Sequence, residues 1–166
     1  ASAITTLSPS RSPMTLLNTT LTVYLGPNQV SRDRMIVKYP SPRKIITMNA
    51  DGSNPVRLTF SATVEYNPVW SPDGNRIVFN SSRDGNGELY AMDPGGSNQV
   101  NLTHNAAFDA NPSWSPDGAR IAFYSNRDGN EEIYVMNADG GGQSRLTNNP
   151  ASDSYPSWSP DGSRIA

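Results

Sequence analysis

Acidic and amide side chains recur at alternate positions in two turns of this sequence, which is how many calcium-binding loops begin. The residues concerned are Asp84, Asn86, Glu88, Asp128, Asn130 and Glu132. A Ca²⁺ ion takes about six to eight oxygen ligands, whereas each turn offers only about three side chains. Asp, Asn and Gly also form tight turns unaided, because they tolerate positive φ or cap their own backbone. We therefore expect plain turns with no cofactor, and keep the six residues as weak calcium candidates.

The sequence offers few residues that could carry out other kinds of catalysis. The sequence contains no cysteine, which excludes disulfides, thiolate nucleophiles and zinc–thiolate sites. It also lacks a Gly-x-Ser-x-Gly elbow, a Gly-x-Gly-x-x-Gly loop and a histidine pair that could hold a metal. The single histidine, His104, falls in a variable loop and is expected to be an ordinary surface residue. We expect no catalytic, cofactor-binding or metal residues, and therefore no enzyme.

Composition narrows the classes of partner. The formal net charge is −2 and 17% of the residues are charged, so the chain has no basic face for gripping phosphates, and nucleic acid is not an expected partner. No apolar run reaches the ~18 residues of a membrane-spanning helix. The most apolar N-terminal segment, residues 14–25, is too rich in Thr and Asn for the core of a signal peptide.

The chain repeats itself with a fixed period. Trp70, Trp114 and Trp158 are 44 residues apart, and the same step relates Arg83 to Arg127. The period extends over residues 43–166. A period of this length indicates a repeat architecture in which one supersecondary unit is copied.

Each repeat is predicted to contain four short strands. In the copy that starts near Tyr66 they are expected at 67–70, 76–80, 88–92 and 99–103. Ser, Pro, Asp, Asn and Gly separate them with turn chemistry, and the first connection, 71–74, has the composition of a type I turn. Gly and Pro interrupt every window long enough for a helix. The pattern predicts an antiparallel meander.

The middle strands are apolar on both faces, as in RIVF at 76–79 and IAFY at 121–124. Both faces must therefore be covered, and copies of the same sheet stacked radially would cover them. The fold class predicted is all-β, a β-propeller built from four-stranded antiparallel blades of about 44 residues. Trp70, Trp114 and Trp158 are expected to fill the space between blades, with stacking on a sugar ring as the alternative.

Three further sets of residues are interpreted as structural features or chance matches rather than as functional sites. The Ser-Pro-Asp-Gly turns account for Asp73, Asp117 and Asp161. Arg76, Arg120 and Arg164 recur beside these turns and are expected to pair with an aspartate. Glycosylation patterns begin at Asn18, Asn80 and Asn101, and the last two fall in predicted strands, which favours chance matches.

The segment NPSWSPDGARIAFYSNRDGNEEIYVMNADG, at 111–140, followed by LTNNP at 146–150, strongly resembles the repeat of TolB-like β-propellers. The likeness covers residues 43–166 and is specific for the blade rather than for one activity. It implies a docking platform in the bacterial envelope that contacts lipoprotein and inner-membrane partners. Similar blades also gate peptidases of the prolyl-oligopeptidase type and occur in many secreted proteins.

The blades are expected to be incomplete within one chain. Residues 1–25 are interpreted as an N-terminal arm that could donate a strand, and 26–166 as about three and a half blades, with a strand at 34–39 and two strands within 157–166. Unpaired blade edges of this kind recruit other strands, so we expect a homo-oligomer or filament. The function expected is a non-enzymatic scaffold for protein–protein interaction or self-assembly, periplasmic or extracellular. The alternative is an accessory or carbohydrate-binding propeller of a larger secreted enzyme.

Overall fold

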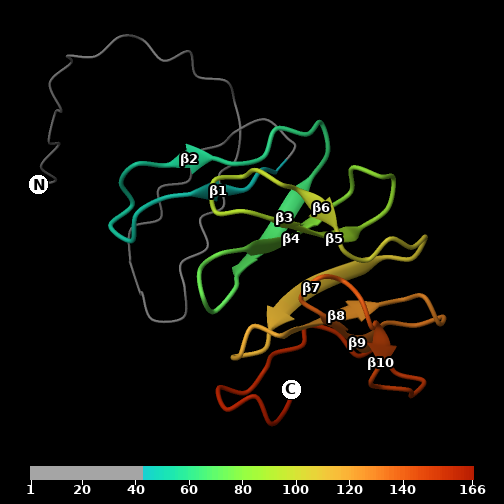
Figure 1. Cartoon of the computed structure of the whole chain (residues 1–166). Helices are drawn as coiled ribbons and strands as arrows, with labels where there is room; N and C mark the ends of the chain where they lie inside the picture. Colours follow the sequence, from blue (N-terminus) through green and yellow to red (C-terminus); the bar gives the residue numbers. More distant parts are fainter. Residues whose placement is uncertain (1–42) are drawn as a thin grey trace, which may run out of the picture.

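The computed structural model describes residues 43–166, and these form strands and turns without any helix (Figure 1). The expectations for the N-terminal arm (1–25), the strand at 34–39 and the glycosylation pattern at Asn18 lie outside the described residues. Within 43–166 the all-β prediction is confirmed.

The strands form three antiparallel sheets, and the two complete ones are copies of each other. The pair β1–β2 is followed by a sheet in the order β3-β4-β5-β6 and by a second in the order β7-β8-β9-β10. The bounds are β1 Ile46–Thr47, β2 Val56–Arg57, β3 Glu65–Trp70, β4 Ile77–Ser81, β5 Glu88–Met92, β6 Val100–Asn101, β7 Asp109–Trp114, β8 Arg120–Ser125, β9 Glu132–Asn137 and β10 Ser144–Arg145.

The register of the two four-stranded sheets repeats down to its irregularities. Val69 pairs with Val78 in the first sheet, and Ser113 pairs with Ala122 in the second. Both first strands carry a bulge, next to Asn67 at φ 49° and Asn111 at φ 53°. Asparagine suits this position because it enters the left-handed region at less cost than most residues.

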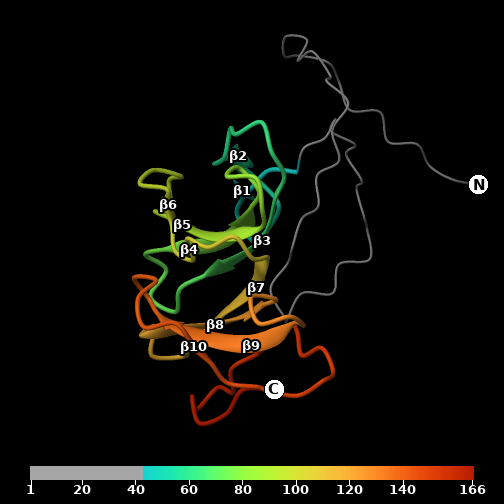
Figure 2. The ribbon, with the colours of Figure 1, turned by 90° about the vertical axis from the view of Figure 1, so that its right-hand side faces the viewer.

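The sheets stack face to face in chain order. Figure 1 shows the β3–β6 sheet between the β1–β2 pair and the β7–β10 sheet, and Figure 2 shows the stack from the side. Strand β7 packs against β3, β4 and β5 of the preceding sheet. This is the arrangement of neighbouring propeller blades, each covering one face of the next.

Alternate residues of each middle strand enter different cores. Ile77 and Phe79 of β4 join the cluster shared with the β1–β2 pair, whereas Val78, between them, joins the cluster shared with the following sheet. In that second cluster Val78 meets Ile121 and Phe123 of β8. The double-sided apolar pattern of the sequence therefore marks two packed faces, as predicted.

Two predicted elements are shorter than expected. The fourth strand was expected at 99–103 but is limited to Val100–Asn101. It ends there because the side-chain oxygen of Asn101 accepts hydrogen bonds from the backbone N–H groups of Thr103 and His104, which turns the chain. Residues 157–166 form one isolated bridge, between Trp158 and Ile165, rather than two full strands.

The three tryptophans differ in burial. Trp114 packs against the core between the two complete sheets. Trp158 is partly buried, with the guanidinium of Arg120 4.7 Å from its ring centre. Trp70 is 50% exposed. The prediction that tryptophan fills the space between blades therefore holds for Trp114 and Trp158 and is wrong for Trp70 within the described residues.

Gly140 lies at a close contact between two blades. It has φ +92°, and a Cβ built on it would lie 2.6 Å from the backbone oxygen of Leu102 in the preceding blade. Gly129 also has a positive φ, of +116°, but has nothing within 4 Å of such a Cβ.

We therefore expect Gly140→Ala to lower the free energy of unfolding by about 2–4 kcal/mol, through backbone strain plus the clash between blades. Gly129→Ala should cost only about 1 kcal/mol, through strain alone. Urea denaturation of both variants checks this. Equal losses of unfolding free energy in the two variants would show that the contact between the blades adjusts to the added methyl group at little cost.

Candidate functional site

The amide of each acidic turn is enclosed by oxygen atoms. The Nδ2 group of Asn86 donates to the Glu88 carboxylate at 3.1 Å and to the backbone oxygens of Asn105 at 2.8 Å and Ala107 at 2.6 Å. Asn130 makes the equivalent three bonds in the next blade. These amides tie the turn between the second and third strands to the connection that leads into the next blade.

The carboxylates of these turns do not converge on a common point. Glu88 accepts the hydroxyl of Thr103 and the backbone N–H of Asn105. Asp84 instead accepts the hydroxyl of Tyr90 and the amide of Asn101. Within residues 43–166, no three His, Cys, Asp or Glu side chains are grouped so that they could hold a metal ion. That these six residues form turns without binding calcium stays a prediction to be tested in solution.

In the third blade an arginine lies between the two acids. Arg145 is 3.4 Å from the Asp128 carboxylate and 2.7 Å from that of Glu132. The hydroxyl of Thr147 and then the guanidinium of Arg145 hold the pKa of Glu132 below its usual value. The positive charge beside these acids is thus supplied by the protein itself.

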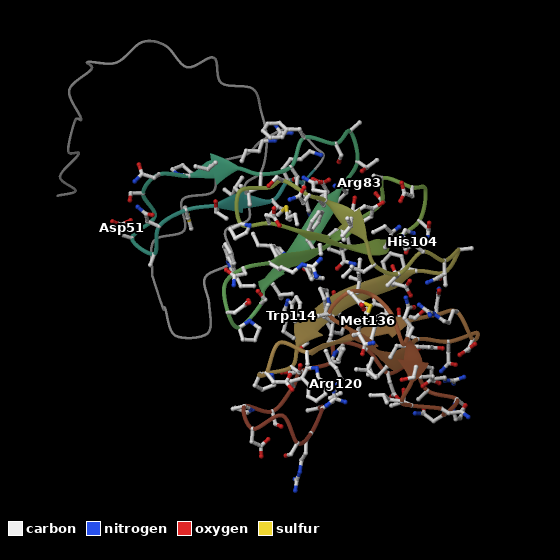
Figure 3. All side chains as sticks on the ribbon, viewed as in Figure 1. Asp51, Arg83, His104, Trp114, Arg120 and Met136 are labelled. Atoms are coloured by element: carbon white, nitrogen blue, oxygen red, sulfur yellow. The ribbon has the colours of Figure 1, made fainter. Side chains whose placement is uncertain are left out.

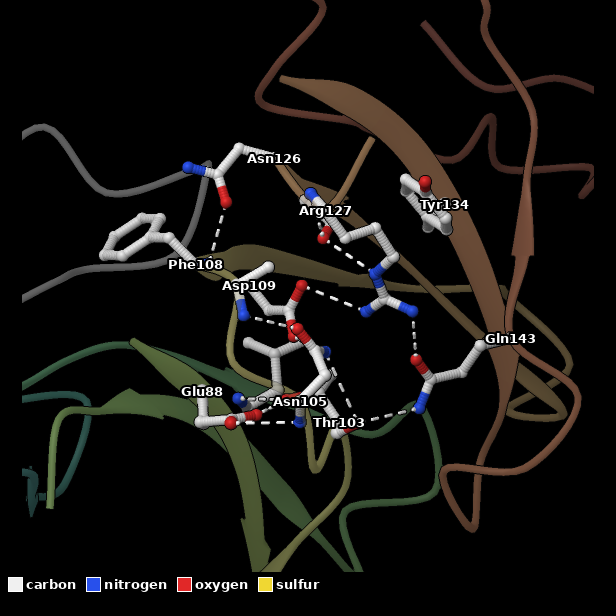
Figure 4. A network of polar contacts seen from close by, with 12 residues as sticks. Glu88, Thr103, Asn105, Phe108, Asp109, Asn126, Arg127, Tyr134 and Gln143 are labelled. Carbon is white, nitrogen blue, oxygen red and sulfur yellow. Dashed lines mark hydrogen bonds and ion pairs between the residues drawn. The ribbon is translucent and has the colours of Figure 1, made fainter. Parts of the chain in front are cut away.

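A second polar network joins consecutive blades through Arg127 (Figure 4). Its guanidinium donates to the buried carboxylate of Asp109 at 3.0 Å and to Gln143 at 2.7 Å. The Gln143 amide then donates to the backbone oxygens of Leu102 and Thr103 in the preceding blade. Arg83, at the corresponding place one blade earlier, binds Glu65 and Gln99 in the same way. We call each such arrangement an arginine strut.

Arg127→Met should lower the free energy of unfolding by about 3 kcal/mol, because it leaves the Asp109 carboxylate buried without its charge partner. Arg164→Met is the matched control, since Arg164 is exposed and its loss should cost under about 0.5 kcal/mol. Denaturant titration measures both. A loss at Arg127 no larger than at Arg164 would contradict a role for the strut in stability.

The Ser-Pro-Asp-Gly turns have the predicted structural role, but their arginines do not. The Ser115 hydroxyl donates to Asp117, and the backbone N–H of Arg120 donates back to the same hydroxyl at 2.9 Å. The expectation that the arginines pair with an aspartate is wrong for Arg76 and Arg120: Arg76 donates to the backbone oxygen of Ala138, and Arg120 lies over Trp158. Arg164 forms no ion pair with a described residue. The aspartates are already occupied by serine and backbone donors.

Acidification should weaken these turns. Hydrogen bonds from the preceding serine hydroxyls lower the pKa values of Asp73 and Asp117, and lower that of Asp161 to about 2. A carboxyl whose pKa is depressed on folding contributes stability above its unfolded pKa, about 4, and loses it as the pH falls through the folded value. We expect stability, measured by urea denaturation, to fall between about pH 4 and pH 2.

The matched variant is Ser71→Ala/Ser115→Ala, which removes the hydroxyls that lower two of these pKa values. It should be less stable than the parent chain at pH 7 and lose less on acidification. An identical loss in both proteins would place the acid sensitivity elsewhere.

His104 and the two remaining glycosylation patterns have clear positions. His104 is exposed on the loop after β6, as predicted, and lies on the same edge of the blades as Arg83, opposite Asp51 (Figure 3). Asn80 is fully buried and donates to the backbone oxygen of Asp109. Asn101 ends its strand through its own side chain. Asn80 therefore cannot accept a glycan in the folded chain.

Residues that break the repeat gather at one place, which the sequence analysis missed. Tyr124 stands where the preceding blade has Asn80, and Tyr155 stands where earlier blades have Asn67 and Asn111. Three further departures from the period lie at the same blade edge. The full set, called here the tyrosine cluster, is Tyr66, Phe108, Tyr124, Glu131 and Tyr155. Its signal in the sequence is departure from the 44-residue period, whereas the predictions above rest on residues that the period preserves.

The rings of the cluster are in contact. Tyr124 is 6.1 Å from Phe108 and 6.1 Å from Tyr155 between ring centres, with the planes tilted by 38° and 43°. Phe108 lies over Gly87, where a Cβ would come within 2.4 Å of its ring. One blade later Glu131 replaces that glycine, and Ser152 replaces the phenylalanine. The phenylalanine–glycine contact of one blade is thus replaced by a serine and a glutamate in the next.

The polar groups of the cluster have no partner among residues 43–166. Tyr124 is only 8% exposed, yet its hydroxyl makes no hydrogen bond to a described residue. Burial, and next the Glu131 carboxylate, raise the pKa of Tyr124 to about 12, and Tyr66 and Tyr155 contribute in the same direction. Tyr155 is 73% exposed and has φ 59°, an unusual backbone state for a bulky residue. Backbone strain at a bulky residue is typical of binding sites.

The fold and the interlocking of the sheets define a β-propeller of four-stranded blades. Residues 106–166 match the family described as TolB beta propeller domain. The blades of this chain resemble TolB-like β-propeller repeats.

Three similar proteins show how the repeat is used elsewhere. A Tol-Pal system protein TolB of Desulfosudis oleivorans is 33% identical over 60 residues, which is 36% of this chain and 14% of that protein. Dipeptidyl-peptidase 5 of Porphyromonas gingivalis is 40% identical over 47 residues, 28% of this chain and 7% of that protein. The structure of a putative TolB from Agrobacterium tumefaciens has a TM-score of 0.67 at 30% identity, covering 74% of this chain and 44% of that one. The chain therefore spans less than half of each of these proteins.

Proposed function

We propose that this chain is a non-enzymatic β-propeller scaffold that binds a protein partner or further copies of itself in the cell envelope or outside the cell. The observation that carries the proposal is the tyrosine cluster. Its residues depart from the repeat, and two of its rings, Phe108 and Tyr155, reach the surface. Tyrosine is among the residues most enriched at the energetic centres of protein interfaces.

The rest of the described chain supports a scaffold. The acids that could have served chemistry, such as Glu88 and Asp109, are buried and hydrogen-bonded within the blades. The structure describes no helix, within residues 43–166, with the length and apolar character to cross a membrane. The likeness to TolB proteins of the Tol-Pal system favours the envelope as the location and a protein as the partner.

An accessory or carbohydrate-binding propeller of a larger secreted enzyme is the second candidate. The matching segment of Dipeptidyl-peptidase 5, a protein of which this chain spans 7%, favours it. Exposed aromatic rings such as Tyr155 also stack on sugars, so the two candidates compete for the same surface.

Affinity capture from an envelope extract and a glycan array separate the two functions. We expect a protein captured by the parent chain, with capture reduced at least about fivefold by Tyr155→Asn, the loss expected when one aromatic contact of an interface is removed. Asp139→Asn, in a turn at the opposite edge of the same blade, is the control and should capture normally. Binding of a single glycan, with no protein captured, would overturn the scaffold in favour of the second candidate.

Light scattering tests self-assembly separately. The scaffold as proposed includes association through blade edges, and such association rises with concentration. We expect the apparent mass of the full chain to increase on concentration. A constant monomer mass would show that the scaffold does not bind copies of itself, and its proposed partners would then be other proteins only.

A further inference from the structure

The chain contains two arginine sites of its own that share one geometry. Arg127 lies 4.6 Å from the ring centre of Tyr134 and 5.6 Å from that of Phe123, and its guanidinium binds the Asp109 carboxylate. Those two rings are 5.8 Å apart and tilted by 32°. A planar guanidinium suits such a site because it stacks on aromatic faces while its edge donates to a carboxylate.

The preceding blade repeats the same arrangement. Arg83 lies 4.4 Å from the Tyr90 ring centre and binds Glu65 at 2.6 Å. The rings beneath it, Phe79 and Tyr90, are 6.0 Å apart and tilted by 34°. A pair of tilted rings with a carboxylate beside it is therefore this chain's own way of holding an arginine.

The tyrosine cluster contains the same parts without the arginine. Tyr124 and Tyr155 are 6.1 Å apart and tilted by 43°, and Glu131 is close enough to act on the pKa of Tyr124. The Glu131 carboxylate forms no ion pair or hydrogen bond with any described residue. No guanidinium of residues 43–166 lies over either ring.

The charges around the cluster favour a cation at one end. Glu131 acts on Tyr124, whereas Arg43, the cation that influences the cluster, acts on Tyr66. The backbone oxygen of Glu131 accepts a hydrogen bond from the N–H of Asp153, so Glu131 lies beside the segment that carries Tyr155. A guanidinium lying over the Tyr124–Tyr155 pair could also donate to the Tyr124 hydroxyl, which makes no hydrogen bond to a described residue.

We propose that the tyrosine cluster is a docking site for an arginine side chain of the partner protein, which lies over the ring pair of Tyr124 and Tyr155 with its edge toward Glu131. This inference rests on the proposed function and names the chemistry by which the scaffold recognises its partner. It also gives a reason for the strained Tyr155, because the asparagine of the other blades would offer no ring.

Peptide binding to the full chain tests the proposal directly. The probes are the acetylated and amidated pentapeptide Gly-Gly-Arg-Gly-Gly and its citrulline counterpart, which keeps the shape of arginine and loses the charge. Two-dimensional NMR follows both titrations. We expect the arginine peptide to bind at least about tenfold more tightly, the value of one desolvated cation–aromatic contact with an added ion pair. Equal affinities, or no binding of either peptide, would overturn the proposal.

Three variants locate the site. Tyr155→Asn restores the residue of the other blades and removes a strained tyrosine, so its melting temperature should be unchanged or higher while arginine binding falls at least about fivefold. Glu131→Gln should weaken arginine binding and leave the fold intact, because its carboxylate bonds to no described residue. Asp139→Asn removes the same charge at the opposite edge of the blade and should bind normally. Full binding by both Tyr155→Asn and Glu131→Gln would overturn the proposal.

The outcomes separate this inference from the scaffold function. Capture of a protein partner that is unaffected by Tyr155→Asn and Glu131→Gln would leave the scaffold standing and overturn the arginine site. Glycan binding that Tyr155→Asn abolishes would assign the cluster to a sugar and overturn both. Capture weakened by both variants, and competed by the arginine peptide, would support both.

Discussion

Burial of both faces of each sheet is the constraint on which the structure depends. Strands such as β4 and β8 place apolar side chains alternately on opposite faces, and neither face can meet water without cost. A single sheet cannot satisfy such strands, whereas a stack of copies can. The 44-residue period is thus a requirement of the packing, because each copy supplies the surface that its neighbour needs.

Polar groups then adjust the distance and rotation between copies. The arginine strut at Arg127 joins a buried acid, a glutamine and, through that glutamine, the backbone of the preceding blade. Asn67 and Asn111, on the innermost strands of consecutive blades, bond directly to each other. Such bonds add little to stability by themselves. They do favour one arrangement of the two apolar sheets, because a shifted sheet would break the bonds from the Gln143 amide to the backbone oxygens of Leu102 and Thr103.

The sequence predicted the fold well because its signals are local and repeated. Turn residues located the strand ends, and two-sided apolar strands predicted the stacking. It predicted Arg76 and Arg120 wrongly, because a recurring arginine next to an aspartate says nothing of the hydroxyl that already occupies that aspartate. It also missed the tyrosine cluster, since Tyr66, Tyr124 and Tyr155 are far apart in the chain and only the stacking of blades brings them together. Departures from a repeat are where sequence reasoning about function should look first.

The matched seams between blades have a consequence for how such a chain can change over generations. The contact of Gly140 with Leu102 is repeated one blade earlier by Gly96 with Leu58, so each seam is built from equivalent residues. A tandem duplication or deletion of one whole repeat would therefore join surfaces that still fit. Recombination that is out of phase would instead place a side chain against a backbone carbonyl. A whole blade is therefore the unit that can be gained or lost. Substitutions can accumulate in the outer turns while the number of blades varies.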